Sequence, residues 1–174
     1  MEKIDYDGEK FYFQKGTIYD ASFVEIPKNL AVDILAYYFN QIDYHDYNED
    51  ALLTFINDLK TAELYADCLK IINFGLGKFS TSVNYHKVVF PIITSCYRSL
   101  KQPQEAINFW FKNKATYGYC ISTPLLTSLA AAYCDIGNYD LAKKCADHAY
   151  AIQGGGKGYN TELSLVYRRI KNKT

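Results

Sequence analysis

A glycine-rich loop near the end of the sequence is the first feature whose residue types could bind a ligand. Gly154–Gly158 contains a lysine and precedes a segment with helical periodicity, so backbone N–H groups and a cation could meet an anion there. A phosphate-binding loop, however, needs a glycine where Ala151 stands and a Ser or Thr where Gly158 stands. Two hypotheses remain, a weak anion site or an ordinary turn between helices. The candidate anion site consists of Gly155, Gly156, Lys157 and Gly158.

Acidic residues and a histidine gather between residues 43 and 50, where a metal site is the obvious hypothesis. Their spacing around His45 fits no calcium-binding loop, which needs a glycine at its turn. We interpret the segment as the acidic start of a helix, where negative charge is favoured by the helix dipole. His86 and His148 have no His, Cys or acidic residue three or four positions further on. We therefore expect no metal and no cofactor.

The cysteines are five in number, widely spaced and set in apolar helical patterns, with no C-x-x-C motif. They are Cys68, Cys96, Cys120, Cys134 and Cys145. This pattern predicts buried free thiols rather than disulfides or a metal site. A thiol nucleophile would need one of the three histidines beside it, and no pair stands out. We therefore expect a protein that is not an enzyme.

The composition is that of an ordinary folded chain. Its 174 residues are 49% hydrophobic, 16% aromatic and 22% charged, which predicts a single domain, 1–174, with a sizeable core. No apolar run approaches the roughly 20 residues of a membrane span. The first five residues lack the apolar core of a signal peptide. We expect a cytoplasmic protein with no membrane partner.

The net charge of zero conceals a strong asymmetry along the chain. Residues 1–67 carry 14 acidic and 5 basic side chains, a net charge of −9, whereas residues 68–174 carry 5 acidic and 14 basic ones, a net charge of +9. The basic half is suited to an acidic protein or a nucleic acid. Opposite halves could also drive a salt-sensitive homo-oligomer, or the charges could simply be solvated.

Residues 1–26 differ from the rest because two turn signals separate short β-type segments. Asp7-Gly8 is a strong two-residue hairpin signal, and Lys15-Gly16 can reverse the chain again. We predict a β-hairpin or meander of two or three strands. A sheet this small is marginal alone, so it should pack on the helices that follow. The residues expected to make that contact are Phe11, Phe13, Ile18 and Phe23.

From Pro27 onward the apolar residues recur at helical spacing, which predicts eight helices. Pro91 should kink the fourth helix or mark its start. The expected helices are about 27–42, a second capped by Asn48 and continuing through Leu59, 61–75 ended by Gly75 and Gly77, 83–99, one from Pro103 through Phe111, one from Thr123-Pro124 to Gly137, 139–152 and 160–171. Residues 27–80 form less regular pairs, and residues 83–171 contain a repeat.

The repeat is clearest between residues 126 and 149. Its pattern positions are Leu126, Leu129, Ala130, Tyr133, Gly137, Tyr139, Ala142, Ala146 and Ala149. Small residues allow two helices to cross closely, and a glycine permits the left-handed turn between them. The pattern occurs 36 residues earlier around Tyr97, with Lys101 at the glycine position, and restarts 34 residues later around Tyr167. Residues 160–171 therefore resemble a capping helix.

This spacing resembles the tetratricopeptide repeat, most clearly over residues 123–171 and fairly over 87–115. The resemblance implies a mainly all-α fold, a right-handed stack of antiparallel helix pairs carrying the N-terminal β-hairpin. It also implies a non-catalytic protein-interaction module, such as an adaptor, a regulatory subunit or an inhibitor.

The concave groove of that family is lined by the first helix of each pair. Members that clamp a terminal carboxylate use Lys and Asn where this chain has Pro91 and Ser95, so that ligand is not supported. Small residues edged by arginines suit an acidic partner segment instead. The expected groove residues are Ser95, Arg98, Thr127, Ala131, Asp135, Leu165, Arg168 and Arg169.

Nucleic acid binding by the basic half, 68–174, is the alternative. Between residues 68 and 115, seven basic side chains oppose only Glu105 and alternate with aromatic residues that could stack on bases. Trp110, however, aligns with a buried position of the repeat. No residue-by-residue code for RNA is visible.

Overall fold

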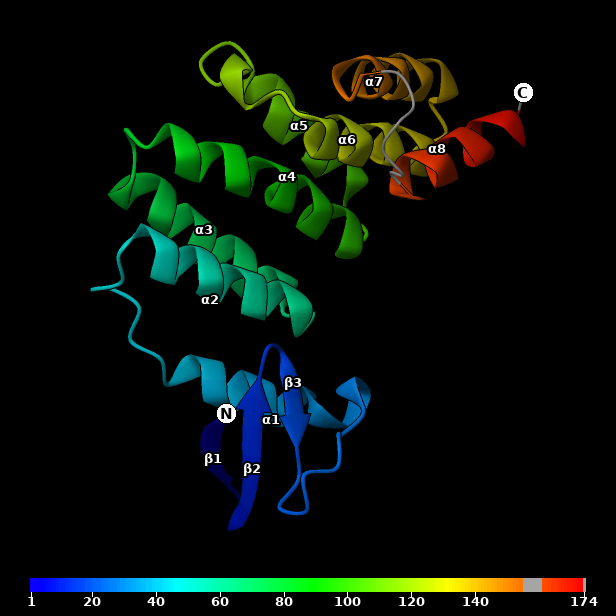
Figure 1. Cartoon of the computed structure of the whole chain (residues 1–174). Helices are drawn as coiled ribbons and strands as arrows, with labels where there is room; N and C mark the ends of the chain where they lie inside the picture. Colours follow the sequence, from blue (N-terminus) through cyan, green and yellow to red (C-terminus); the bar gives the residue numbers. More distant parts are fainter. Residues whose placement is uncertain (155–160, 174) are drawn as a thin grey trace. The chain divides into compact units, whose positions relative to one another are not determined.

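A computed structural model describes residues 1–154 and 161–173. The chain divides into two compact units, residues 1–79 and 80–174, here called the N-terminal and C-terminal units. Figure 1 labels the helices and strands along the chain, coloured from blue at the N-terminus to red at the C-terminus. The sequence suggested a single domain, with its internal boundary between residues 80 and 83. The chain is mainly helical, with one small antiparallel sheet, as predicted.

The charge asymmetry follows this division. The N-terminal unit carries 14 acidic and 7 basic side chains, a net charge of −7. The C-terminal unit carries 5 acidic and 12 basic ones, a net charge of +7. Each unit therefore has its own electrostatic character, which favours partners of opposite sign.

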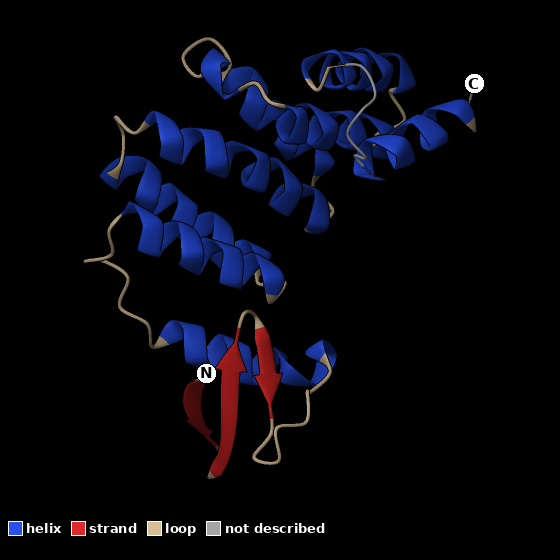
Figure 2. Ribbon diagram, viewed as in Figure 1, coloured by secondary structure: helices blue, strands red, loops and turns tan. Residues whose placement is uncertain are grey.

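The predicted meander is present at the start of the N-terminal unit. Strands β1 (Glu2–Tyr6), β2 (Glu9–Gln14) and β3 (Thr17–Tyr19) pair antiparallel in the order β1-β2-β3 (Figure 2). Both two-residue turns are confirmed, since Asp7, Gly8, Lys15 and Gly16 all have φ between 49° and 80°. This left-handed backbone matches the twist of the paired strands.

One face of the sheet packs on helix α1 (Lys28–Asn40). Ile4 pairs with Phe11 and Phe13 with Ile18 across the strands, and all four side chains are buried. The ring of Phe13 lies 5.3 Å from that of Phe39 on α1. The expectation for Phe23 was wrong, because its side chain is 60% exposed. It lies in the loop after β3 and stacks on Tyr12 instead.

Helices α2 (Glu49–Thr61) and α3 (Tyr65–Lys78) form a pair. Asn48 caps α2 as predicted, since its side chain accepts a hydrogen bond from the N–H of Ala51 at 2.9 Å. The predicted end of α3 at Gly75 was wrong. Gly75 is buried inside the helix, and its carbonyl accepts from the N–H of Phe79 at 2.7 Å. A buried glycine is tolerated there because packing outweighs its low helix propensity.

The C-terminal unit contains α4 (Val83–Ser99), α5 (Pro103–Asn113), a short 3-10 helix (Gly118–Cys120), α6 (Thr123–Asp135), α7 (Tyr139–Ile152) and α8 (Thr161–Lys171). Pro91 lies inside α4 and does not mark its start, because the Ser82 side chain caps the helix by accepting from Tyr85. Ser122 rather than Thr123 caps α6. A hydroxyl one residue earlier satisfies the same free N–H groups.

Helices α6 and α7 form the tightest pair. Gly137 has a φ of 79°, and the next N–H, that of Asn138, donates to the carbonyl of Tyr133 at 2.9 Å. The Thr123 hydroxyl, at the start of α6, donates to the carbonyl of Ala149 near the end of α7, so the two helices run antiparallel. The predicted small contact residues are fully buried; they are Ala130, Ala142, Ala146 and Ala149.

Helix α8 covers this pair with an apolar stripe formed by Leu163, Val166 and Ile170. In the part of the chain that the structure describes, no helix combines the length and apolar character needed to cross a bilayer.

Candidate functional site

Two arginines of the expected groove meet one carboxylate in the C-terminal unit. Nε of Arg98, in the last turn of α4, lies 2.9 Å from Oδ2 of Asp135, the last residue of α6. Nη2 of Arg169 on α8 lies 2.7 Å from the other carboxylate oxygen, Oδ1. Arg98 also approaches Glu162 at 3.5 Å. One carboxylate therefore bridges guanidinium groups from two helices.

The repeat spacing in the sequence relates two of these residues, Asp135 and Arg169. Ser99, Asp135 and Arg169 occupy equivalent positions two residues after Tyr97, Tyr133 and Tyr167. Helix α6 contacts both α4 and α8, and these contacts bring Arg98, Asp135 and Arg169 together. The side chains of Arg98 and Asp135 are only 20% and 26% exposed, which strengthens their attraction relative to a fully solvated pair.

A pocket of about 520 Å³ lies beside this network. Three basic side chains and one acidic side chain line it, together with Ser99 and Pro103. The charged residues are Arg98, Lys101, Arg169 and Asp135. Sequence reasoning missed Lys101 as a site residue, although it stands at the glycine position of the repeat. Its φ of 62° shows that it makes the left-handed turn after α4.

The other expected groove residues are not brought to this pocket. Thr127 and Ala131 are 0% and 2% exposed, because α6 contacts α4, α5, α7 and α8. Ser95 is half-buried, whereas Leu165 is 48% exposed. Arg168 is exposed and forms no ion pair with the described residues. The candidate anion loop, Gly155, Gly156, Lys157 and Gly158, lies outside the described residues.

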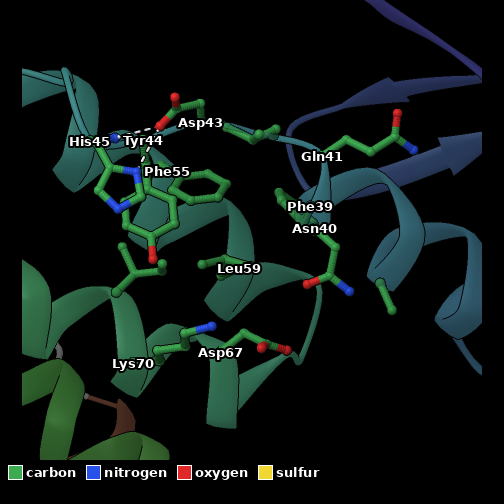
Figure 3. Close-up of a pocket in the computed structure, with 13 residues that line it drawn as sticks. Phe39, Asn40, Gln41, Asp43, Tyr44, His45, Phe55, Leu59, Asp67 and Lys70 are labelled. Carbon is green, nitrogen blue, oxygen red and sulfur yellow. Dashed lines mark hydrogen bonds and ion pairs between the residues drawn. The ribbon is translucent and has the colours of Figure 1, made fainter.

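A second pocket, which sequence reasoning missed, lies in the N-terminal unit (Figure 3). It has a volume of about 380 Å³ and lies between the end of α1, residues 41–45, α2 and α3. Buried apolar side chains line it, namely Phe39, Phe55, Leu59 and Ile71. Polar side chains surround them, including Asn40, Asp67 and Lys70. Only the packing of three helices creates this pocket, so no local pattern predicted it.

The acidic segment beside this pocket differs partly from its prediction. Glu49 and Asp50 do lie in the first turn of α2, but Asp43, His45 and Asp46 precede the helix. Asp43 accepts from the backbone N–H of His45 at 3.0 Å and lies 2.7 Å from its ring nitrogen. These contacts, the backbone hydrogen bond first, lower the pKa of Asp43. The described residues contain no group of three or more His, Cys, Asp or Glu side chains arranged for a metal.

The segment is held in place by aromatic rings and a lysine. Tyr44 stacks on His45 with ring centres 4.8 Å apart, and its ring also meets Phe74 of α3 at 5.2 Å. Lys78, at the end of α3, donates to the carbonyls of His45 and of Tyr47, the latter at 2.8 Å. This lysine therefore has a structural role within the N-terminal unit.

The cysteines are free, as predicted, and Cys145 alone is half-buried rather than buried. Burial raises the pKa of Cys120 to about 11 and also raises the pKa of Cys134 and of Cys145. A thiol with a raised pKa stays protonated at neutral pH and is a poor nucleophile.

The aromatic residues expected to stack on nucleic acid bases are mostly occupied within the protein. Trp110 and Tyr85 are buried, and Phe109 packs on Phe90 with ring centres 5.0 Å apart. Phe111 is exposed, with the Lys114 ammonium 4.1 Å from its ring centre. A stacking platform of several rings is not present among these residues.

No protein-family model matches this chain, and no curated protein or solved structure is significantly similar to it. The function must therefore be argued from the geometry of the two units.

Proposed function

We propose that the chain is a non-catalytic interaction module whose C-terminal unit binds an acidic segment of a protein partner. The binding site in this proposal is the pocket lined by Arg98, Lys101 and Arg169. The observation that carries the proposal is the convergence of two guanidinium groups and one ammonium group on a pocket of about 520 Å³ with only one acidic lining residue. Such a surplus of positive charge favours a carboxylate-bearing ligand.

The internal contact with Asp135 supports carboxylate as the ligand group. Its two oxygens accept separately from Arg98 and Arg169, so helices α4 and α8 hold two guanidinium groups at a spacing that one carboxylate bridges. Each guanidinium has five N–H donors, and Asp135 uses few of them. The remaining donors are available to acidic side chains of a partner.

The proposal includes a tetratricopeptide-like, right-handed stack for α4–α5, α6–α7 and the cap α8. The antiparallel α6–α7 pair, the left-handed turn at Gly137 and the fully buried alanines support it. An adaptor, a regulatory subunit or an inhibitor in the cytoplasm would use the site in the same way, by occupying a surface of its partner.

The test measures fluorescence anisotropy with a labelled peptide of alternating Glu and Ser residues. Arg169→Gln should weaken binding about fivefold, since an exposed charge-assisted contact contributes about 1 kcal/mol. Arg168→Gln is the matched control, because it removes the same charge from the adjacent position of α8, outside the pocket. Equal losses in the two variants would reduce the proposal to a general charge effect.

Two further measurements complete the test. Reversal of Arg98 and Arg169 to Glu should abolish peptide binding, and unchanged binding would refute this site. A single-stranded oligonucleotide of equal charge serves as competitor. If it binds more tightly than the peptide and loses affinity in Arg169→Gln, the basic unit recognises phosphate, and the nucleic acid alternative replaces this proposal.

A further inference from the structure

A third pocket, of about 310 Å³, lies in the N-terminal unit between β1, α1 and α2. Two carboxylates and four aromatic rings dominate its lining. They are Glu2 and Asp58 with Tyr38, Phe39, Tyr47 and Phe55. Tyr47 belongs to the segment at residues 43–50, but the two carboxylates belong neither to that segment nor to the expected groove.

Neither carboxylate has an ion-pair partner among the described residues. No basic side chain of the described residues lies within 4 Å of Asp58 or Glu2. Glu2 accepts a hydrogen bond from the hydroxyl of Tyr38, which is a neutral donor. Among the described residues, the pocket therefore holds two carboxylates without an ion pair, one of which accepts a hydrogen bond from a hydroxyl.

Burial and the neighbouring Glu2 both disfavour further negative charge in this pocket. Burial, followed by the charge of Glu2, raises the pKa of Asp58 above its ordinary value. Burial, then the hydrogen bond to Glu2, also raises the pKa of Tyr38. Both shifts have the sign expected where negative charge is costly, and a bound cation would oppose both.

The rings determine what kind of cation fits. Tyr38 lies 5.1 Å from Phe39, and Phe55 lies 5.6 Å from Phe39 and 6.0 Å from Tyr47, measured between ring centres. A calcium ion needs six to eight oxygen ligands, which two carboxylates in an aromatic wall do not supply. Organic cations, by contrast, are stabilised by a carboxylate together with aromatic rings.

We infer that this pocket binds the guanidinium or ammonium group of a basic side chain on a partner polypeptide. Its volume is at the lower limit for small-molecule sites and suits a single long side chain. The net charge of −7 on the N-terminal unit attracts a basic partner over longer distances. The inference is independent of the proposed function, because the site lies on the other unit and has the opposite charge.

The experiment is an NMR titration of the full-length, ¹⁵N-labelled chain with Nα-acetyl-arginine amide. Nα-acetyl-citrulline amide, which has nearly the same shape but no charge, is the control ligand. The arginine derivative should shift the amide signals of residues 54–58 with a Kd at least tenfold lower than that of the citrulline derivative. Equal affinities would overturn the inference.

Matched variants localise the effect. Asp58→Asn should weaken binding of the arginine derivative at least tenfold, whereas Asp33→Asn, which removes an exposed charge from α1 outside the pocket, should change it less than twofold. Equal changes in Kd for the two variants would mean that the net negative charge of the unit binds the ligand, and would overturn the assignment to this pocket. If Asp58→Asn does not fold, Glu2→Gln, which removes the other carboxylate of the pocket, should weaken binding of the arginine derivative at least tenfold.

The source of the cation is tested with free arginine. Its charged α-amino and carboxylate groups are absent from the blocked derivative, which represents a residue within a polypeptide. Tighter binding of the blocked derivative supports a polypeptide partner. Tighter binding of free arginine would show that the pocket recognises a small molecule, and would overturn the assignment to a partner chain.

Discussion

Arg98 and Asp135 form an ion pair between the last turns of α4 and α6, with Nε and Oδ2 separated by 2.9 Å. The same carboxylate also accepts a hydrogen bond from Arg169, so it uses one donor of each guanidinium group in the proposed site. Asp135 consequently has two opposing effects. It stabilises the fold by neutralising two partly buried arginines, and it competes with an acidic ligand for their N–H donors.

Asp135→Asn should therefore separate stability from binding. We expect the free energy of unfolding to fall by about 1 kcal/mol, because two charge-assisted hydrogen bonds are weakened. We expect affinity for the acidic peptide to rise about fivefold, because both arginines lose the charge of Asp135 and Arg98 keeps only the longer contact to Glu162. Urea unfolding and fluorescence anisotropy measure the two effects. Asp140→Asn removes an exposed charge from the first turn of α7, so it should leave peptide affinity unchanged and lower stability only by the few tenths of a kcal/mol of its interaction with the helix dipole. Weaker peptide binding in Asp135→Asn would instead show that Asp135 orients the arginines.

The second β-turn provides a test of packing within the N-terminal unit. Gly16 and Gly8 have nearly equal φ angles of 79° and 80°. A Cβ at position 16 would lie 2.5 Å from Cγ2 of Thr61 at the end of α2, whereas a Cβ at position 8 would meet nothing within 4 Å. Gly8→Ala should cost about 1 kcal/mol from backbone strain alone. Gly16→Ala should cost clearly more, because the turn must also move away from α2.

Thermal unfolding of the two variants measures this difference directly, since their backbone strain is matched. Equal melting temperatures would mean that the contact between the turn and α2 contributes nothing to stability. For a unit of this size, each additional 1 kcal/mol lowers the melting temperature by about 4–8 °C.

The features that sequence predicted best are those set by a few neighbouring residues. Asp7-Gly8 and Lys15-Gly16 require left-handed backbone whatever packs nearby, and both hairpins are present. Gly137 similarly adopts the left-handed backbone of the turn that follows α6. The wrong expectations concern residues whose state depends on distant contacts. Gly75 was expected to end a helix, yet it is buried inside α3.

The candidate sites also divide into features that local spacing predicts and features that depend on distant contacts. The repeat spacing placed Arg98, Asp135 and Arg169 among the expected groove residues, and the structure brings these three together. The repeat spacing could not show that Thr127 is buried, because the burial of Thr127 depends on four helices packing around α6. The two pockets of the N-terminal unit are formed by segments far apart in sequence. Asp58 and Glu2, for example, are separated by 56 positions and have no common motif.

The opposite charges of the two units predict salt-sensitive self-association. The acidic unit of one copy, with a net charge of −7, attracts the basic unit of another, with a net charge of +7. Sedimentation equilibrium should give a mass above 19.9 kDa at low salt that falls to this monomer value near 0.5 M salt, where the Debye length is only a few ångströms. A mass that does not change with salt would contradict the prediction.

Asp58 makes the stability of the N-terminal unit depend on pH in an unusual direction. Because the folded-state pKa of Asp58 is raised, ionising this group costs more in the folded chain than in the unfolded chain. The cost is absent below the unfolded pKa of about 3.8 and is complete above the raised folded pKa. Asp58→Asn should therefore stabilise the protein at pH 7, by several tenths of a kcal/mol given the partial solvent exposure of the side chain. At pH 3 the variant and the parent should be equally stable.

Urea unfolding at the two pH values tests this, with Asp33→Asn as the exposed control. A variant less stable than the parent at pH 7 would mean that Asp58 has a favourable partner in the folded state. The same measurement bears on the cation pocket. Saturating Nα-acetyl-arginine amide should stabilise the parent at pH 7 more than it stabilises Asp58→Asn, because a ligand that binds only the folded state raises its stability by an amount set by its affinity. Equal stabilisation of both proteins would place the bound cation away from Asp58.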